Sequence, residues 1–458
     1  MEDMLLQVKQ LLEEKNYVKL KSILDDMNPA DIALLLENIA EDELPLIFRI
    51  LSKEIASDTF VEMSSDSQEL LINAFSDTEL KAVIEDMFLD DTVDIIEEMP
   101  ANVVRRILNQ ANPDTRSAIN ELLQYPKDSA GTIMTVEYIS LKSNMTVKQC
   151  FDHIRKNAIN KETIYTCYVT DPQRKLLGLV SVKDLLLNTY ETVVGDIMET
   201  NVIYAFTSTD KEEVAGMFSK YGFSALPIVD NEQRLVGIVT IDDAIDVLEE
   251  ETTEDITKMA AIIPTSTDKP YLETSVWKLW ASRIPWLLIL LISATFTGLI
   301  INNYESTLNM PIYGIILTAC IPMLMDSGGN AGSQACVTVI RSIALGELQF
   351  KDLFKVIWKE LRVSFLVAIV MGIGCFAKLQ IIDRLIVGNA GYTVELSLIV
   401  SVALMATVII AKFIGCTLPI LAKKIHLDPA VVASPIITTI VDAVSLMIYC
   451  SIAIAILS

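Results

Sequence analysis

The chain is poor in basic residues and in histidine. Its 458 residues include 36 Lys and Arg against 60 Asp and Glu, a formal net charge of −24, and only 2 His. Nucleic-acid-binding proteins carry a basic stripe, so this deficit argues against that class. The 7 cysteines never occur in C-x-x-C spacing, which predicts neither a disulfide framework nor a zinc site. The motifs G-x-x-x-x-G-K-[ST] and H-E-x-x-H are missing too, and we expect no enzymatic activity.

Apolar sequence is abundant, and it is concentrated in the second half. The chain is 52% hydrophobic with a mean hydropathy of +0.42, more apolar than ordinary globular proteins. Residues 1–268 hold 50 acidic against 23 basic residues, a net −27, which leaves +3 for residues 269–458. The first 15 residues, MEDMLLQVKQLLEEK, do not resemble a signal peptide. We therefore predict a cytosolic N-terminus and an acidic cytosolic half, followed by a half embedded in the lipid bilayer.

Five apolar runs can each be extended to the roughly 20 residues that cross a bilayer. They are Ile284–Ile301, Ser306–Met325, Val363–Ala377, Leu396–Ala411 and Pro429–Ser458. Basic residues gather in the second and fourth connections, which the positive-inside rule places in the cytosol. The sequence thus predicts a multi-pass protein of the plasma (inner) membrane with its C-terminus outside.

Asp442 lies within the last apolar run, near the expected middle of the bilayer. An ionised carboxylate there costs roughly 2.5 to 3.5 kcal/mol on insertion scales, and such residues usually face a water-filled path or an ion. The alternative is a protonated or paired Asp with a structural role. Thr438 and Ser445, at i−4 and i+3, extend a hydrophilic stripe on the same helix face. This stripe predicts a pore wall.

The polar run DSGGNAGSQ, residues 326–334, interrupts the second apolar segment. Irregular backbone at membrane depth is tolerated only where it is buried in protein or lines a cavity, so the run predicts a polar vestibule with Asp326 and Asn330 as candidate lining residues. Close helix packing is an alternative explanation for the glycines alone. Glu360, beside Lys359 and Arg362, is interpreted as an interfacial anchor, whereas Lys412 receives no role.

Residues 131–255 contain an internal repeat. Gly131-Thr-Ile-Met recurs as Gly195-Asp-Ile-Met, and the segment LGLVSVKD at 177–184 recurs as VGIVTIDD at 236–243. Each copy predicts a strand, a helix (Val147–Asn157 or Lys211–Tyr221), two strands joined by a turn, and a second helix. This α/β order resembles a tandem pair of cystathionine-β-synthase (CBS) domains. In that family a G-x-x-S/T-x-x-D run holds adenosine ribose, and Ser181/Asp184 and Thr240/Asp243 match its spacing; whether ATP binds here stays open.

The segments on either side of the repeat are helical and acidic. Residues 1–130 show apolar i, i+3, i+4 spacing throughout, which predicts a right-angled stack or superhelix of short helices. Asp90 and Asp94 share one face there. Residues 242–255 hold eight carboxylates in 14 residues. A charge run is usually a solvated face, but its place between the repeat and the first span favours a site where Mg²⁺ or Ca²⁺ acts.

Together with GGNAGSQ and the pattern P-x-x-x-T-x-x-D (Pro435, Thr439, Asp442), these features resemble the MgtE family of magnesium channels over essentially the whole chain. The resemblance implies a homodimer with one central pore, in which Asp442 of both subunits holds hydrated Mg²⁺. The pore-lining candidates are Asp326, Asn330, Ser434, Thr438, Thr439 and Ser445. Carried over where motifs match, the cytosolic Mg²⁺ sites fall on Asp90, Asp94, Asp243, Asp246, Glu251, Glu254 and Asp255. The chain departs from the family pattern at Ser434, where Asn is familiar, and at Lys412, where a small polar residue is expected.

The expected architecture is a multidomain membrane protein. It comprises a superhelical α-helical N-domain (1–130), an α/β tandem CBS pair (131–254), a linker helix (255–280) and a transmembrane domain of five helices (281–458). The expected function is a Mg²⁺-selective channel that admits Mg²⁺ down its electrochemical gradient and closes when cytosolic Mg²⁺ is high. The alternatives are a CBS-regulated secondary carrier that couples a divalent cation to Na⁺ or H⁺, and a membrane-anchored scaffold.

Overall fold

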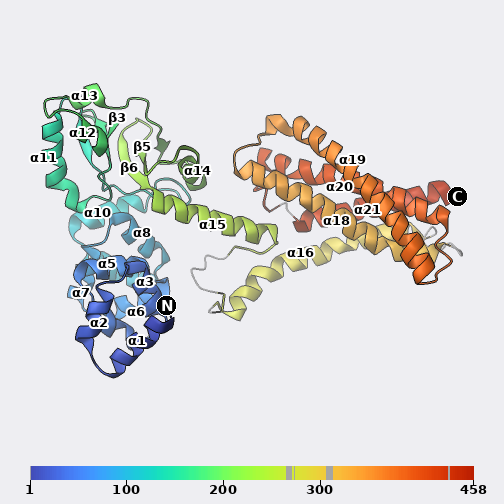
Figure 1. Ribbon diagram of the computed structural model, residues 1–458, viewed down its shortest axis with the longest axis horizontal. Helices are drawn as coiled ribbons and strands as arrows, with labels where there is room; N and C mark the ends of the chain where they lie inside the picture. The colour runs from blue at the N-terminus through green and yellow to red at the C-terminus, as the bar shows by residue number, and fades with distance from the viewer. Residues whose placement is uncertain (1, 265–270, 273, 306–312, 432–433, 458) are drawn as a thin grey trace. The chain divides into compact units, whose positions relative to one another are not determined.

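The computed structural model describes residues 2–264, 271–272, 274–305, 313–431 and 434–457 (Figure 1). The chain forms two compact units, Met1–Glu250 and Glu251–Ser458.

The first unit begins, within the described residues, with ten short α-helices. They are α1 (Glu2–Glu13), α2 (Tyr17–Leu24), α3 (Pro29–Glu37), α4 (Leu44–Phe48), α5 (Lys53–Val61), α6 (Ser65–Ala74), α7 (Asp77–Ile84), α8 (Leu89–Glu98), α9 (Ala101–Gln110) and α10 (Pro113–Leu122). Local sequence sets several starts: Asn28 and Asn112 cap α3 and α10 with their side chains, and Pro29 and Pro113 occupy the first helical position, where no N–H is needed. The predicted helical character of this segment is confirmed, whereas its superhelical path stays a prediction.

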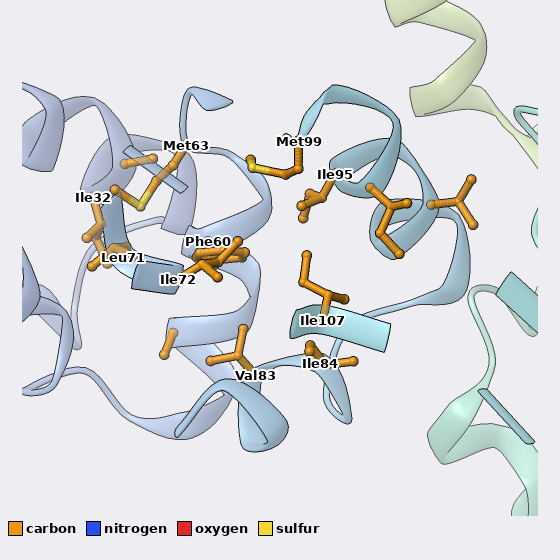
Figure 2. Packing of buried hydrophobic residues seen from close by; sticks show 14 of the residues in the cluster. Ile32, Phe60, Met63, Leu71, Ile72, Val83, Ile84, Ile95, Met99 and Ile107 are labelled. Atoms are coloured by element: carbon orange, nitrogen blue, oxygen red, sulfur yellow. The ribbon is translucent and has the colours of Figure 1, made fainter. Parts of the chain in front are cut away.

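These helices share one apolar core, because none is long enough to be stable alone. Figure 2 shows its middle, where Ile32 and Leu71 pack on one side and Ile95 and Ile107 on the other side of Phe60. The same buried cluster continues into the second CBS copy through Phe218 and Leu226. The helical domain and the CBS pair therefore fold against each other within one unit.

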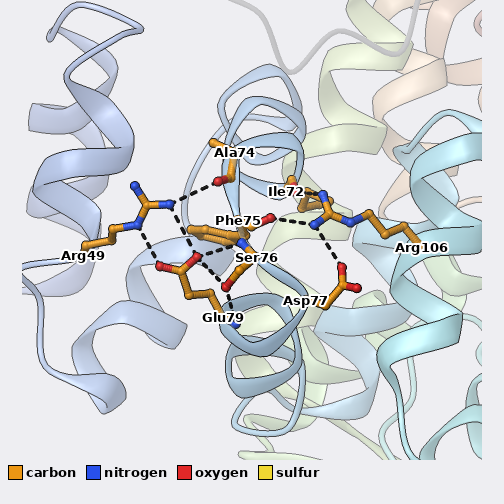
Figure 3. Close-up of polar contacts among 8 residues, drawn as sticks. All are labelled: Arg49, Ile72, Ala74, Phe75, Ser76, Asp77, Glu79 and Arg106. Atoms are coloured by element: carbon orange, nitrogen blue, oxygen red, sulfur yellow. Dashed lines mark hydrogen bonds and ion pairs between the residues drawn. The ribbon is translucent and has the colours of Figure 1, made fainter.

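Two arginines, Arg49 directly after α4 and Arg106 in α9, hold the turn between α6 and α7 (Figure 3). Arg49 Nε donates to Glu79 Oε1 at 2.7 Å, and Arg106 Nη2 donates to the carbonyl oxygen of Phe75 at 2.6 Å. Glu79 also forms a reciprocal capping box with Ser76 at the start of α7. The hydrogen bond from Arg49, followed by those from Ser76, lowers the pKa of Glu79 to about 2.

The CBS pair consists of two copies, each with a three-stranded sheet. The first copy has β1 (Ser140–Lys142), α11 (Val147–Asn157), η1 (Ala158–Asn160), β2 (Thr166–Thr170), β3 (Leu176–Ser181) and α12 (Val182–Leu187); the second has α13 (Val194–Ile197), β4 (Ala205–Phe206), α14 (Lys211–Tyr221), β5 (Ala225–Val229), β6 (Leu235–Thr240) and α15 (Ile241–Met259). In both sheets the first pairing is parallel and the second antiparallel. The helices α11 and α14 have the bounds that the repeat predicted.

Both copies of the repeat have a glycine at the same position of the last strand, and close packing explains it. A Cβ on Gly178 would lie 2.7 Å from the carbonyl oxygen of Glu199, and one on Gly237 would lie 2.7 Å from that of Thr135. In each copy a neighbouring segment therefore packs directly on the strand backbone, at a distance that only glycine allows.

The second unit contains the long helices. They are α16 (Val276–Asn303), α18 (Gly314–Ala344), α19 (Leu353–Ala377), α20 (Val394–Lys424) and α21 (Ser434–Leu457), with a short helix η2 (Phe350–Asp352) before α19 and a π-helical extension η3 (Lys378–Ile386) after it. Buried Leu317, Leu404 and Val441 belong to one core that α18, α20 and α21 share.

Among the described residues, four helical stretches are long and apolar enough to cross a membrane: Val276–Asn303, Phe350–Ile386, Val394–Lys424 and Pro435–Leu457. The predicted span Ser306–Met325 is not one of them. Residues 306–312 lie outside the described residues, and the rest of that run belongs to α18, which continues to Ala344. The helix there ends later than the apolar run indicated, because the polar residues 326–334 are themselves helical. The count of five spans stays a prediction.

Candidate metal sites

Asp442 lies on α21 where this helix meets α18. A Cβ on Gly329 of α18 would lie 3.1 Å from Thr438 Cγ2 and 3.9 Å from Asp442 Oδ1. The side chain of Asp442 is half-buried, and no Lys or Arg among the described residues forms an ion pair with it. Asp326 lies about one helical turn before Gly329 on the same helix. The two membrane carboxylates that the sequence singled out therefore belong to one site.

The polar run 326–334 is regular helix rather than irregular backbone, which corrects the sequence interpretation. Its glycines explain the difference, because Gly328 and Gly332 are buried against α20 and α21. A Cβ on Gly328 would lie 2.7 Å from Thr407 Cγ2, and one on Gly332 would lie 3.1 Å from Ile437 Cγ2. Small residues let helix backbones approach closely without unwinding. The packing alternative is thus correct for these glycines.

The polar side chains of the same run lie on the opposite, exposed face of α18. Asp326, Asn330 and Gln334 are spaced by four residues and are all exposed. Asn330 Nδ2 donates to Asp326 Oδ1 at 3.2 Å. An exposed polar stripe on a helix packed in an apolar bundle is costly against lipid, so it requires water or another protein surface beside it.

The other predicted pore-lining residues have varied surroundings. Thr438 and Thr439 are half-buried and donate to the carbonyl oxygen of Pro435 at 3.0 and 2.9 Å. Ser445 is only 1% exposed and lies against α18, with its Oγ 2.9 Å from where a Cβ on Gly328 would be. Ser434 begins α21, and its side chain lies outside the described residues.

Glu360 and Lys412 face each other inside the second unit. Lys412 Nζ on α20 lies 3.9 Å from Glu360 Oε2 on α19, and the two side chains are 7% and 15% exposed. Glu360 therefore has a partner within the helix bundle, whereas its role as an interfacial anchor stays a prediction. The apolar residues around it, Val356 and Cys416 among them, exclude water, so each charge requires the other.

In the first unit, acids of α8 and α15 share one buried region. Asp90 is 6% exposed, and its Oδ1 has no hydrogen-bond partner in the described part of the chain. Burial, and then the charge of Asp243, raises the pKa of Asp90 well above its usual range. The same causes raise the pKa of Asp94 to about 8, and burial raises that of Asp243 to about 6 despite a hydrogen bond from Thr240.

Four further acids join this region, and none of them was among the predicted site residues, although Asp242 belongs to the acidic run 242–255. They are Asp91, Glu137, Glu162 and Asp242. Burial, then the charges of neighbouring acids, raises the pKa of Asp91 and of Glu162 to about 7. Glu137 Oε2 accepts a hydrogen bond from the N–H of Leu89 at 3.2 Å, at the start of α8. Glu137 precedes β1 in the sequence, and nothing in the neighbouring sequence indicated that it would lie beside other acids.

These carboxylates are close but not arranged as a closed ligand set. Among the described residues, no group of three or more His, Cys, Asp or Glu side chains is placed to hold a metal ion directly. The residue types nevertheless fit Mg²⁺, which keeps several of its waters and is usually held by one or two carboxylates. Asp246 lies nearby on α15, where burial, and then Asp242, raises its pKa.

Three of the predicted sensor acids, Glu251, Glu254 and Asp255, belong to the second unit. Glu254 Oε1 lies 2.7 Å from Lys258 Nζ, and the same ammonium group is 2.7 Å from Asp428 Oδ2. Burial, and then the charge of Asp428, raises the pKa of Asp255. The last turns of α15 therefore form a separate charged cluster next to the loop that precedes α21.

The two predicted nucleotide pairs cap helices. Ser181 Oγ donates to Asp184 Oδ2 at 2.5 Å before α12, and Thr240 Oγ1 donates to Asp243 Oδ2 at 2.6 Å before α15. The repeat thus places the same hydroxyl–carboxylate pair at the end of the last strand in each copy.

An acidic helical domain packed against a CBS pair, followed by apolar helices that carry carboxylates, fits a transporter of divalent cations. Sequence models agree: that of the MgtE divalent cation transporter family matches residues 321–452, that of the MgtE intracellular N domain matches 27–128, and that of the CBS domain matches 130–189 and 194–250. The chain is 33% identical to the magnesium transporter MgtE of Thermus thermophilus over 99% of its length and 98% of that protein. It is 31% identical to MgtE of Bacillus subtilis, over 99% and 97%.

The chain therefore belongs to the MgtE family, whose members are transporters rather than enzymes. Solved structures agree for the first half. The cytosolic domain of the Mg²⁺ channel MgtE in complex with ATP aligns with a TM-score of 0.51 and 33% identity over 53% of this chain and 99% of that one. The soluble part of a magnesium transporter aligns equally well, with a TM-score of 0.51 and 27% identity over 55% of this chain and 99% of that one.

Proposed function

We propose that this protein is a homodimeric Mg²⁺ channel that admits Mg²⁺ into the cell down its electrochemical gradient. The observation that carries the proposal is Asp442, a half-buried carboxylate on an apolar helix with no basic partner among the described residues. A carboxylate kept in such surroundings is stabilised by a passing cation or by water. The relatives named as magnesium transporters supply the choice of ion.

The exposed stripe of Asp326 and Asn330 supports the homodimer. If a second copy faces this stripe, both Asp442 side chains and both stripes border one polar pathway. Mg²⁺ sheds its waters reluctantly, so a pathway with two carboxylates and amide groups suits a hydrated ion better than a closed protein cage. Ser434, Thr438, Thr439 and Ser445 stay predicted pore residues on the same helix.

No coupling ion is needed to drive this flux. A divalent cation gains about 4.6 kcal/mol on entering a cell at −100 mV, at about 2.3 kcal/mol for each charge. The coupled carrier that remains the alternative function would require a second gradient, which transport measurements can impose or remove.

Cytosolic Mg²⁺ closes this channel by binding acids of the first half. Asp90, Asp94, Asp243 and Asp246 repel one another without a counter-ion, and the unpartnered Oδ1 of Asp90 is a ready ligand within the described part of the chain. Mg²⁺ binds more tightly when these acids lie close together than when they are apart. This difference in affinity shifts the population of channels toward the closed form, in which the acids are close. Glu251, Glu254 and Asp255 extend this response to the linker helix. ATP at Ser181/Asp184 or Thr240/Asp243 is proposed as a further ligand, supported by the related cytosolic domain solved with ATP.

The test is Mg²⁺ uptake by proteoliposomes without Na⁺ or proton gradients. Asp442→Asn and Asp442→Ala should each reduce the uptake rate at least about tenfold. Each substitution removes a contact to a charged group, and such a contact contributes about 1.5 to 3 kcal/mol. Glu347→Gln, an exposed acid after α18, is the matched control and should transport as wild type does. Uptake that survives both Asp442 substitutions, or that needs an imposed Na⁺ or proton gradient, would overturn the channel proposal.

A further inference from the structure

The predicted linker helix 255–280 is not one helix, because α15 ends at Met259 and α16 begins at Val276. One ammonium group joins the end of α15, which we call the linker helix, to the loop before α21. Lys258, in the last turn of α15, donates from Nζ to Asp428 Oδ2 at 2.7 Å and lies 2.7 Å from Glu254 Oε1. Its side chain is 21% exposed, so water screens these contacts only partly. Partial burial acts against the charge, but hydrogen bonds to Asp428 and Glu254 outweigh it and raise the pKa of Lys258.

Asp428 also forms a local hydrogen bond within the loop that precedes α21. Its Oδ1 accepts a hydrogen bond from the N–H of Ala430 at 2.8 Å. The carboxylate therefore connects Lys258 on one side with the segment leading into the helix that carries Asp442 on the other.

Further contacts dock the same stretch of chain onto the membrane unit. Met259 packs against the core formed by α18, α20 and α21. The N–H of Ile263 donates to the carbonyl oxygen of Ser282 on α16 at 2.9 Å, and Ser282 is buried. These contacts are neutral, whereas Lys258 adds a charged contact between the same stretch and the loop before α21.

We propose that Lys258 is a resident counter-ion that holds the linker helix against the α20–α21 loop without metal and thereby biases the pore toward its closed state. This inference rests on the proposed channel function and adds a closing element that is independent of Mg²⁺. Without Lys258, the carboxylates of Glu254, Asp255 and Asp428 face one another uncompensated, and their repulsion drives the helix away from the loop.

The experiment records Mg²⁺ currents from excised inside-out patches with the cytosolic face in EDTA. Lys258→Met should raise the open probability roughly three- to tenfold, the range expected for a charge-assisted contact of partial exposure. Asp428→Asn breaks the same contact from the other side and should act alike. Lys258→Arg should preserve the wild-type value, and Lys258→Asp combined with Asp428→Lys should restore it.

Lys355→Met is the matched control. Lys355 pairs with Asp352 at 2.8 Å in the same unit, but its side chain is 83% exposed and the pair lies within one segment. If the wild type carries a Mg²⁺ current, either of two results would overturn the inference. One is an unchanged open probability in Lys258→Met and Asp428→Asn, and the other is an equal rise in Lys355→Met. If the wild type carries no Mg²⁺ current, the proposed function itself fails, and this inference with it.

Discussion

At the residue scale, glycine decides how closely the membrane helices pack. A Cβ on Gly415 of α20 would clash with the carbonyl oxygen of Gly332 on α18, and one on Gly332 would lie 3.2 Å from the carbonyl oxygen of Ala411. Both obstacles are backbone atoms, which cannot rotate away as a side chain can. The contact lies within the polar run of α18, so the packing beside Asp326 depends on it.

Gly415→Ala should therefore destabilise the membrane unit by about 1 to 3 kcal/mol or more, the usual range for overpacking. The melting temperature of the detergent-solubilised protein measures this effect, and we expect a fall of several degrees. Gly374→Ala is the control, because nothing lies within 4 Å of its Cβ position on α19, and removing a helical glycine is by itself stabilising. Equal melting temperatures for the two variants would contradict the close crossing of α18 and α20.

Sequence analysis identifies residues that are unusual within their own segment of the chain. It misses residues whose role depends on a partner far away in the sequence. Asp442 and Asp326 are visible because a charge in an apolar run is anomalous wherever the helix packs. Glu360 and Lys412 look unrelated in the sequence, and they form a pair only because α19 and α20 pack together. Glu162 joins the acidic region for the same reason, through the folding of the CBS pair onto α8.

At the element scale, α8 and α15 meet through faces that carry the same charge. Asp91 and Asp94 on α8 and Asp243 on α15 have pKa values of about 7, 8 and 6, each raised first by burial and then by a neighbouring acid. An unfolded Asp titrates near 4. A carboxyl group whose pKa is raised by folding favours the folded state while it is protonated, and that stability is lost as the pH rises through its folded pKa.

The first unit should accordingly lose stability, by about 1 to 3 kcal/mol, as the pH rises from about 6 to about 8 in EDTA. Thermal unfolding of the full chain in detergent at the two pH values measures this loss. The variant Asp91→Asn/Asp94→Asn should show a smaller dependence, since it removes the groups with the highest pKa values among the three. Adding Mg²⁺ at the higher pH should restore the wild type, because metal binds the deprotonated carboxylates. A wild type that is equally stable at both pH values in EDTA would contradict the buried acid cluster.

Elements with strong local signals were predicted well. The helices α11 and α14 carry clear periodicity and caps at Thr146 and Asp210, and their bounds agree with the prediction. The start and end of α18 were not predicted, because hydropathy detects apolar runs and the helix continues through a polar one. Its continuity depends on contacts of Gly328 and Gly332 with other helices, which no local pattern encodes.

At the scale of the whole molecule, the distribution of charge favours one orientation in the membrane. The acidic half, with a net charge of −27, precedes the first apolar helix, and basic residues cluster from the last turn of α18 to the first turns of α19. They include Arg341, Lys351, Lys355, Lys359 and Arg362. The positive-inside rule places this connection beside the acidic half in the cytosol only if both α16 and α18 cross the bilayer.

The number of membrane crossings can therefore be tested with reporters fused after the last two helices, α20 and α21. With 31 residues, α18 is about 46 Å long at about 1.5 Å per residue, enough to cross, and it shares its core with α20 and α21. If it crosses, the chain spans five times, so a reporter fused after Lys424 lies in the cytosol and one fused after Leu457 lies outside. Green fluorescent protein should then fluoresce at the first position only, and alkaline phosphatase should be active at the second only. If α18 does not cross, only the four helical stretches of high hydropathy span, both reporters invert, and the basic connection before α19 would lie outside against the charge rule.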